Sequence, residues 1–304
     1  MRIGALAGAF LVTAASSAPG APPAPSVTST ADPSTCAREP FAESTPVPEA
    51  SGAAWIDFGG KPALLVTSDS GDHGAYAIVD AGSGATLEEG NFPLGNTTDD
   101  LEGLSARDGK IYGVISPGWI YVWKRGAHGY DLVDGPYALG PVDLPPKKGG
   151  NHPPAGTGMV CDAGVTNCGR NYEGLCLRPG GGSDANGCTG YVAAKADGHL
   201  YCLTADAHGR LAVTRDHAIA IDRPAVLADC TYADDGSLWA ADNMFGLADV
   251  FRVDVDRGSA AKFASLGVGF PEVLAVRGDV FYRMSDTGGA PSLMAKFRCP
   301  ARSK

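Results

Sequence analysis

A recurring pattern constrains the fold of this chain more than any other feature: an acidic residue, a short polar turn and alternating apolar runs. It is clearest at 98–124, where Glu102 precedes a turn at Asp108 and alternating runs at 111–114 and 120–123. Alternation with a period of two, in short runs separated by glycine-containing turns, predicts antiparallel strands in meander order.

The pattern occurs five times between residues 51 and 300. The other copies begin at Ala54, Glu173, Asp229 and Glu272, and the copy at Ala54 lacks the acid. Units at a spacing of about 40 to 50 residues are typical of propeller blades, which bury both faces of each sheet against their neighbours. The sequence therefore predicts an all-β fold, a β-propeller with five blades, with six as the alternative.

The N-terminal residues differ in composition from the repeats. Residues 1–16 contain one arginine and an apolar run too short to cross a bilayer, which predicts a signal peptide and no transmembrane segment. Residues 17–50 are rich in Pro, Ala, Ser and Thr, which predicts a disordered linker. We expect one propeller domain over 51–300 with an irregular insert at 140–170, where the repeat is interrupted.

The net charge and the predicted export signal limit the classes of partner that this chain can have. The formal net charge of −10 disfavours nucleic acid, because phosphate binding needs clustered Lys and Arg. We expect a secreted monomer, periplasmic or extracellular in a bacterium, whose partner is a small molecule or another protein.

Export makes the eight cysteines candidates for disulfides rather than zinc ligands. Cys36 and Cys299 flank the repeats, and a bond between them would close the ring. The other six lie between 159 and 231 and are expected to pair locally, with Cys161–Cys168 the shortest loop and Cys176–Cys188 the next. The sequence alone does not exclude other pairings.

Four carboxylates occupy the same position of successive repeats: Glu102, Glu173, Asp229 and Glu272. Asp229 precedes Leu238 by nine residues, just as Glu102 precedes Ile111. Equivalent positions of inner strands form a ring around a propeller's channel, where bare carboxylates repel one another. A divalent cation would neutralise them, and calcium suits such an all-oxygen site best. Two alternatives stay open: each carboxylate accepts main-chain N–H groups of the next blade, or one glutamate is catalytic.

A second set of polar residues follows the second strand of each repeat and could add ligands at the rim of the channel. It comprises Asp69, Ser116, Lys195, Asp242 with Asn243, and Ser285 or Asp286. Turn formation is the simpler explanation for most of them.

The motifs Asp100-Leu-Glu-Gly-Leu and Asn171-Tyr-Glu-Gly-Leu resemble those of the SdiA-regulated and phytase-like ("esterase-like") propeller families. The resemblance implies an exported propeller with bound calcium in some members, and Glu102 and Glu173 are the matching positions. The Asp-Asp-Pro-Ala signature of β-propeller phytases is absent, because Asp99-Asp100 is followed by Leu-Glu, so phytate hydrolysis is not expected.

These observations lead to two functional hypotheses. The first is a non-catalytic, calcium-stabilised propeller that binds a ligand or partner. The second is a metal-dependent hydrolase of the lactonase or phosphoester type, with its metal held by Glu102, Glu173, Asp229 and Glu272.

Overall fold

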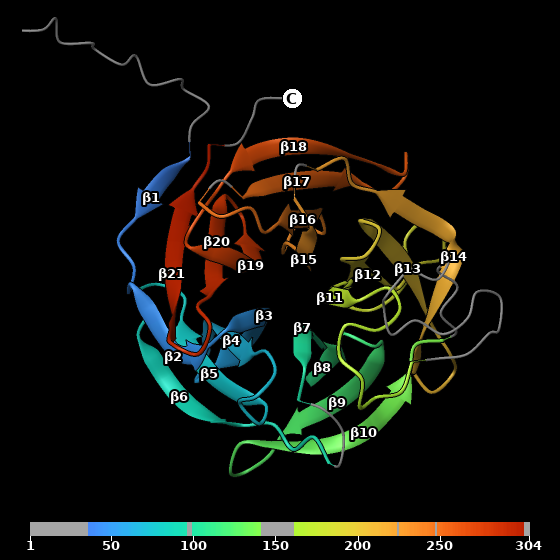
Figure 1. Cartoon of the computed structure of the whole chain (residues 1–304), viewed down its shortest axis with the longest axis horizontal. Coiled ribbons are helices and arrows are strands. Elements are labelled where there is room, and N and C mark those ends of the chain that lie inside the picture. The colour runs from blue at the N-terminus through green and yellow to red at the C-terminus, as the bar shows by residue number, and fades with distance from the viewer. Residues whose placement is uncertain (1–35, 96–98, 141–160, 224, 247, 301–304) are drawn as a thin grey trace, which may run out of the picture. The chain divides into compact units, whose positions relative to one another are not determined.

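Five antiparallel sheets surround a common centre in the computed structural model of this chain (Figure 1). The structure describes residues 36–95, 99–140, 161–223, 225–246 and 248–300. Within these ranges no helix has the length and hydrophobicity of a membrane span. Each sheet is one blade, so the predicted five-bladed propeller is confirmed.

Four blades are four-stranded meanders in chain order. Blade 1 contains β3 (Ala50–Phe58), β4 (Lys61–Ser68), β5 (Ala75–Asp80) and β6 (Thr86–Asn91). Blade 2 contains β7 (Leu101–Arg107), β8 (Lys110–Ile115), β9 (Trp119–Arg125) and β10 (Tyr130–Ala138). Blade 3 contains β11 (Tyr172–Leu177), β12 (Gly190–Ala194), β13 (His199–Ala205) and β14 (Leu211–Ala220). Blade 4 contains β15 (Leu227–Tyr232), β16 (Leu238–Asp242), β17 (Asp249–Asp254) and β18 (Ser259–Ser265).

Blade 5 joins the two ends of the described chain. It contains β19 (Phe270–Arg277), β20 (Val280–Asp286) and β21 (Pro291–Arg298), with β1 (Ala37–Glu39) and β2 (Ser44–Pro48). Both N-terminal strands pair antiparallel with β21, and the predicted Cys36–Cys299 disulfide is present beside them. The prediction of a disordered linker up to residue 50 is therefore wrong for its last part, because β1 and β2 add to the free edge of β21 and β3 already begins at Ala50. Residues 1–35 lie outside the described residues.

The core lies between blades, where apolar side chains of neighbouring sheets interdigitate. Between blades 1 and 2, Leu65 and Ile78 pack with Trp123, which is fully buried and stacks on Phe92 with ring centroids 4.4 Å apart. The innermost strands β3, β7, β11, β15 and β19 each contact the next around the ring, and β19 contacts β3. The channel is thus lined by five first strands that all run in the same direction.

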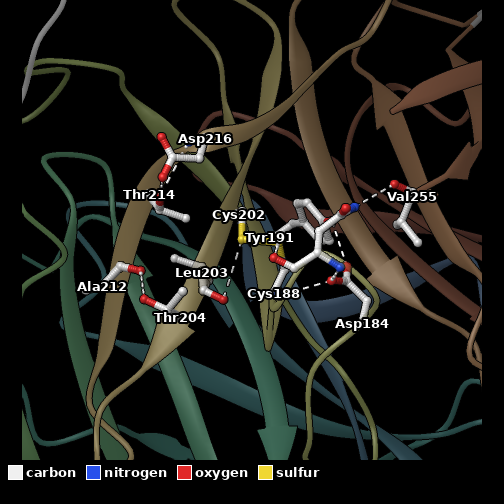
Figure 2. The surroundings of a disulfide bond; sticks show 11 residues. Asp184, Cys188, Tyr191, Cys202, Leu203, Thr204, Ala212, Thr214, Asp216 and Val255 are labelled. Atoms are coloured by element: carbon white, nitrogen blue, oxygen red, sulfur yellow. Dashed lines mark hydrogen bonds between the residues drawn. A yellow bond between two sulfur atoms is a disulfide. The ribbon is translucent and has the colours of Figure 1, made fainter. Parts of the chain in front are cut away.

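The structure pairs all eight cysteines. The predicted Cys161–Cys168 disulfide is present, but the predicted Cys176–Cys188 bond is wrong. Cys176 on β11 is bonded to Cys230 on β15 of the next blade, and Cys188 is bonded to Cys202 on β13. Figure 2 shows the surroundings of the latter bond, where Asp184 accepts hydrogen bonds from the Cys188 N–H and the Tyr191 hydroxyl. Sequence proximity is misleading here because Cys176 lies on an inner strand that faces the neighbouring blade.

Candidate metal centre

Each inner strand contains a β-bulge close to its first residue. In β7 the register shifts between Leu101 and Gly103, so Glu102 has no residue opposite it on β8. A bulge redirects a side chain and commonly borders functional sites. The bulges of the five strands include Ser51, Glu102, Glu173, Ala228 and Glu272.

The residue after the bulge is glycine in blades 1, 2 and 3. A Cβ added to Gly103 would lie 2.5 Å from the Leu175 nitrogen, and one added to Gly52 would lie 2.8 Å from the Leu104 nitrogen. Only glycine permits such an approach of one backbone to another. The glycine of the Glu-Gly-Leu motif therefore allows the backbones of neighbouring inner strands to pack close together. This close packing brings the preceding glutamates near one another.

Three of the predicted glutamates converge. Glu102, Glu173 and Glu272, from blades 2, 3 and 5, each place a carboxylate oxygen within 4.8 Å of the others, and all three are at most 5% exposed. Burial removes water from all three carboxyl groups and raises the pKa of each. The pKa of Glu173 rises to about 8.

The chain neutralises this cluster only in part. Lys195 Nζ lies 2.9 Å from Glu173 Oε2 and 3.9 Å from Glu272 Oε1. The Ser51 hydroxyl, at the bulge where blade 1 lacks an acid, donates to Glu102 Oε2 over 2.8 Å. Asn243 donates to Glu272 over 3.2 Å. Among the described residues none donates to Glu173 Oε1, which is buried. A buried carboxylate oxygen without a partner points to a missing proton or cation.

A second acidic group shares Glu102. Asp69 and Asp100 each place a carboxylate oxygen within 4.8 Å of a Glu102 oxygen. The Ser116 hydroxyl donates to Asp100, and burial raises the pKa of Asp69 to about 7, with the Asp100 charge adding to the shift. The two groups together contain five carboxyl groups and one ammonium, that of Lys195.

Asp229 does not join the glutamates. Its Oδ2 accepts the Leu274 N–H of blade 5 over 2.7 Å, and its Oδ1 accepts its neighbour's N–H, that of Cys230. The register of β15 shows why: Asp229 pairs with Ala241 just as Gly103 pairs with Val114, so Ala228 occupies the bulge. Asp229 is therefore one residue out of register with Glu102, and its carboxylate joins two blades.

The polar residues that follow the second strand of each repeat also fall into two kinds: some contact the acidic groups and others form local hydrogen bonds. Asp69, Ser116, Lys195 and Asn243 contact the acidic groups, as described above. The Asp242 carboxylate instead accepts the Asp249 N–H, and the Ser285 hydroxyl accepts the Leu293 N–H. Sequence reasoning missed the roles of Asp100 and Ser51. The first stands two residues before Glu102, and this Asp-x-Glu spacing was the available signal.

The geometry suits a hard cation with oxygen ligands. Two oxygens bound to one calcium ion can lie about 5 Å apart, because each Ca–O distance is about 2.4 Å. Glu102, Glu173 and Glu272 meet that condition, and Asp69, Asp100 and the Asn243 amide lie beside them. Among the residues that the structure describes, no sulfur or imidazole ligand belongs to either acidic group, which disfavours zinc and copper.

Fold and site together define a five-bladed propeller with a buried acidic cluster at its channel. No family profile and no curated protein matches the chain. A luciferin-regenerating enzyme is 9% identical, with a TM-score of 0.51 over 88% of this chain and 96% of that one. Streptogramin B lyase is 13% identical (TM-score 0.46, 87% and 98% covered), and the Myxococcus xanthus glutaminyl cyclase 14% (TM-score 0.46, 87% and 97%). The likeness to the luciferin-regenerating enzyme supports the general propeller fold, and no comparison shows the SdiA-regulated or phytase-like family.

Proposed function

We propose that this protein is an exported propeller that binds one calcium ion at the channel and presents a ligand- or partner-binding surface. The observation that carries the proposal is the convergence of Glu102, Glu173 and Glu272 within 4.8 Å in a buried setting. Folding places these like charges together, and a divalent cation offsets their repulsion and their lost hydration.

The ion's role is structural in this proposal. Its three ligands come from blades 2, 3 and 5, so binding would join sheets that are far apart in the chain. A ligand that binds only the folded state stabilises it by about 2.7 kcal/mol at a concentration one hundred times its Kd. The resemblance of the Glu-Gly-Leu motifs to SdiA-regulated and phytase-like propellers supports the same assignment.

Export is supported by the four disulfides, which form and persist in oxidising compartments. A small molecule or protein partner is the proposal for what the propeller binds, and the protein is proposed to act as a monomer.

The second candidate is a metal-dependent hydrolase of the lactonase or phosphoester type. One feature favours it: Asp69 lies beside the three glutamates without being one of the assigned ligands, and burial raises its pKa to about 7, in the range that suits a general base at neutral pH. A bound cation would polarise a substrate oxygen or lower the pKa of a water molecule there.

Metal analysis of the purified mature chain, followed by thermal melts with and without chelator, tests the proposal. We expect calcium near one equivalent and a lower melting temperature after chelation. A chain that contains no divalent metal, and whose melt chelator does not change, contradicts it. Glu173→Gln separates the candidates: loss of calcium-dependent stability alone supports the structural role, and loss of ester or lactone turnover with an unchanged fold supports the hydrolase.

A further inference from the structure

A second feature of the channel is a cavity on the side away from the acidic cluster. It has a volume of about 380 Å³ and is lined by residues of all five inner strands, among them Trp55, Leu104, Leu175, Tyr232 and Val276. These residues follow the bulges by two to four positions, so the cavity lies about 7 to 13 Å further along the strands, at 3.3 Å per residue. The close packing at Gly52, Gly103 and Gly174 lies between the two sites.

The lining is mostly apolar and has one flat wall. The Trp55 indole is fixed by a 3.1 Å hydrogen bond from Nε1 to the Val276 carbonyl and by edge contact with Tyr282, at 5.4 Å between centroids. Ala53, Ala54, Ala106 and Leu177 supply further apolar surface. Concave apolar sites of this size, with a few polar groups, are typical of small-molecule binding.

One cationic group stands at this cavity. The Arg277 guanidinium carbon lies 5.4 Å from the Trp55 ring centroid. The guanidinium's ion-pair partner is Asp234 at 3.9 Å, too long for a hydrogen bond, and both side chains are about half exposed. Asp57 accepts the Gly60 N–H in its own turn, and Asp234 accepts the Gly278 N–H of the neighbouring blade 5. Arg277 therefore remains available to a ligand, and guanidinium pairs best with a planar anion such as a carboxylate.

We propose that this cavity binds a small, flat, apolar molecule with one carboxylate or sulfonate group. The apolar body packs on Trp55 and the aliphatic lining, and the anionic group pairs with Arg277. The proposal does not depend on calcium, because none of the acidic-cluster residues lines the cavity.

Titration calorimetry with 2-naphthoate and its neutral analogue 2-naphthamide, both in chelator, tests this. We expect both compounds to bind the wild type. Arg277→Gln should weaken 2-naphthoate binding about tenfold and leave 2-naphthamide almost unchanged, because only the anion loses a charge-assisted hydrogen bond. Ala106→Leu, which adds bulk to the lining, should weaken both.

Arg252→Gln is the matched control. Arg252 also lies over a tryptophan, 6.0 Å from the Trp239 ring, but it does not line this cavity. Binding of both compounds should match the wild type, and equal melting temperatures confirm that each variant is folded. Failure of the wild type to bind either compound would overturn the proposal. So would an Arg277→Gln effect that is equal for the two compounds, or binding that Ala106→Leu leaves intact.

Discussion

Glu173 in blade 3 and Asp229 in blade 4 are both buried carboxylates near the start of an inner strand, yet they meet different groups. Glu173 is in a β-bulge and faces Glu102, Glu272 and Lys195. Asp229 is one position past the bulge and accepts two main-chain N–H groups. A shift of one residue turns a side chain to the other side of a strand. Register, more than residue type, therefore decides which carboxylates can bind a cation and which join blades.

The comparison predicts that the two residues respond differently to calcium. Asp229→Ala leaves the buried N–H groups of Leu274 and Cys230 without an acceptor, which should cost about 3 kcal/mol of unfolding free energy. The loss should be the same in calcium and in chelator, as measured by urea unfolding.

Asp206→Ala is the control for that substitution. Asp206 also accepts two main-chain N–H groups, from His208 and Arg210, but in an exposed turn where water replaces the lost acceptor. Its cost should be below about 1 kcal/mol. A loss for Asp229→Ala that appears only in calcium would place this residue among the metal ligands.

Glu173→Gln, unlike Asp229→Ala, should lose stability only when calcium is present. With calcium at one hundred times the wild-type Kd, the variant should lose about 2.7 kcal/mol of unfolding free energy. In chelator at pH 8 it should be as stable as the wild type or more so, because a buried negative charge has been removed. Glu89→Gln, an exposed change on β6, should alter neither value. Equal losses in both conditions would show that Glu173 acts only through its pair with Lys195.

The pKa values predict how stability depends on pH. Burial raises the pKa of Glu173 to about 8 and that of Asp69 to about 7, so the folded, calcium-free state retains protons that the unfolded state releases above pH 4.5. Stability in chelator should therefore be greatest near pH 5 and fall by several kcal/mol as pH rises to 8, because each group loses about 1.4 kcal/mol per pH unit between its unfolded and folded pKa; it should level off above the folded pKa values. Calcium should reduce or reverse this fall, since it binds the ionised carboxylates. A flat profile in chelator would indicate that these carboxyl groups titrate normally.

The smallest expected effect is the difference in stability between variants that lack one of two disulfides in blades 3 and 4. Cys176–Cys230 joins two blades and closes a loop of 54 residues, whereas Cys188–Cys202 lies within blade 3 and closes a loop of 14. By loop entropy, replacing the first pair by alanine should cost about 1 kcal/mol more than replacing the second. Urea unfolding of the two double variants measures this. A larger cost for the pair within blade 3 would contradict the ranking.

The fold was accessible from the sequence because each blade repeats the same period-two pattern and turn signals. The terminal strands at 37–48 were not, because a segment rich in Pro, Ser and Thr becomes a strand only where the edge of β21 accepts it. The Cys176–Cys230 bond was missed for a related reason: which residues of two inner strands face each other depends on how the blades pack.

Three of the four carboxylates that the sequence grouped together are close to one another in the structure, and whether they bind a metal stays a prediction. Glu102, Glu173 and Glu272 converge, and spacing to the second strand placed Asp229 beside them incorrectly. Ala106 pairs with Ile111 across four residues, whereas the equivalent pair in blade 4, Tyr232 with Leu238, is separated by five. The longer turn compensates for the shift in register, so the interval of nine residues is the same in both blades although the bulge is not.

Calcium titration of the chelator-treated protein by calorimetry tests the central claim most directly. We predict one ion bound per chain by the wild type and by Asp229→Asn, and binding by Glu173→Gln that is about a hundredfold weaker or absent. A wild type that binds no calcium, or a Glu173→Gln variant that binds it as tightly as the wild type, would contradict the assignment of the three glutamates as the metal ligands.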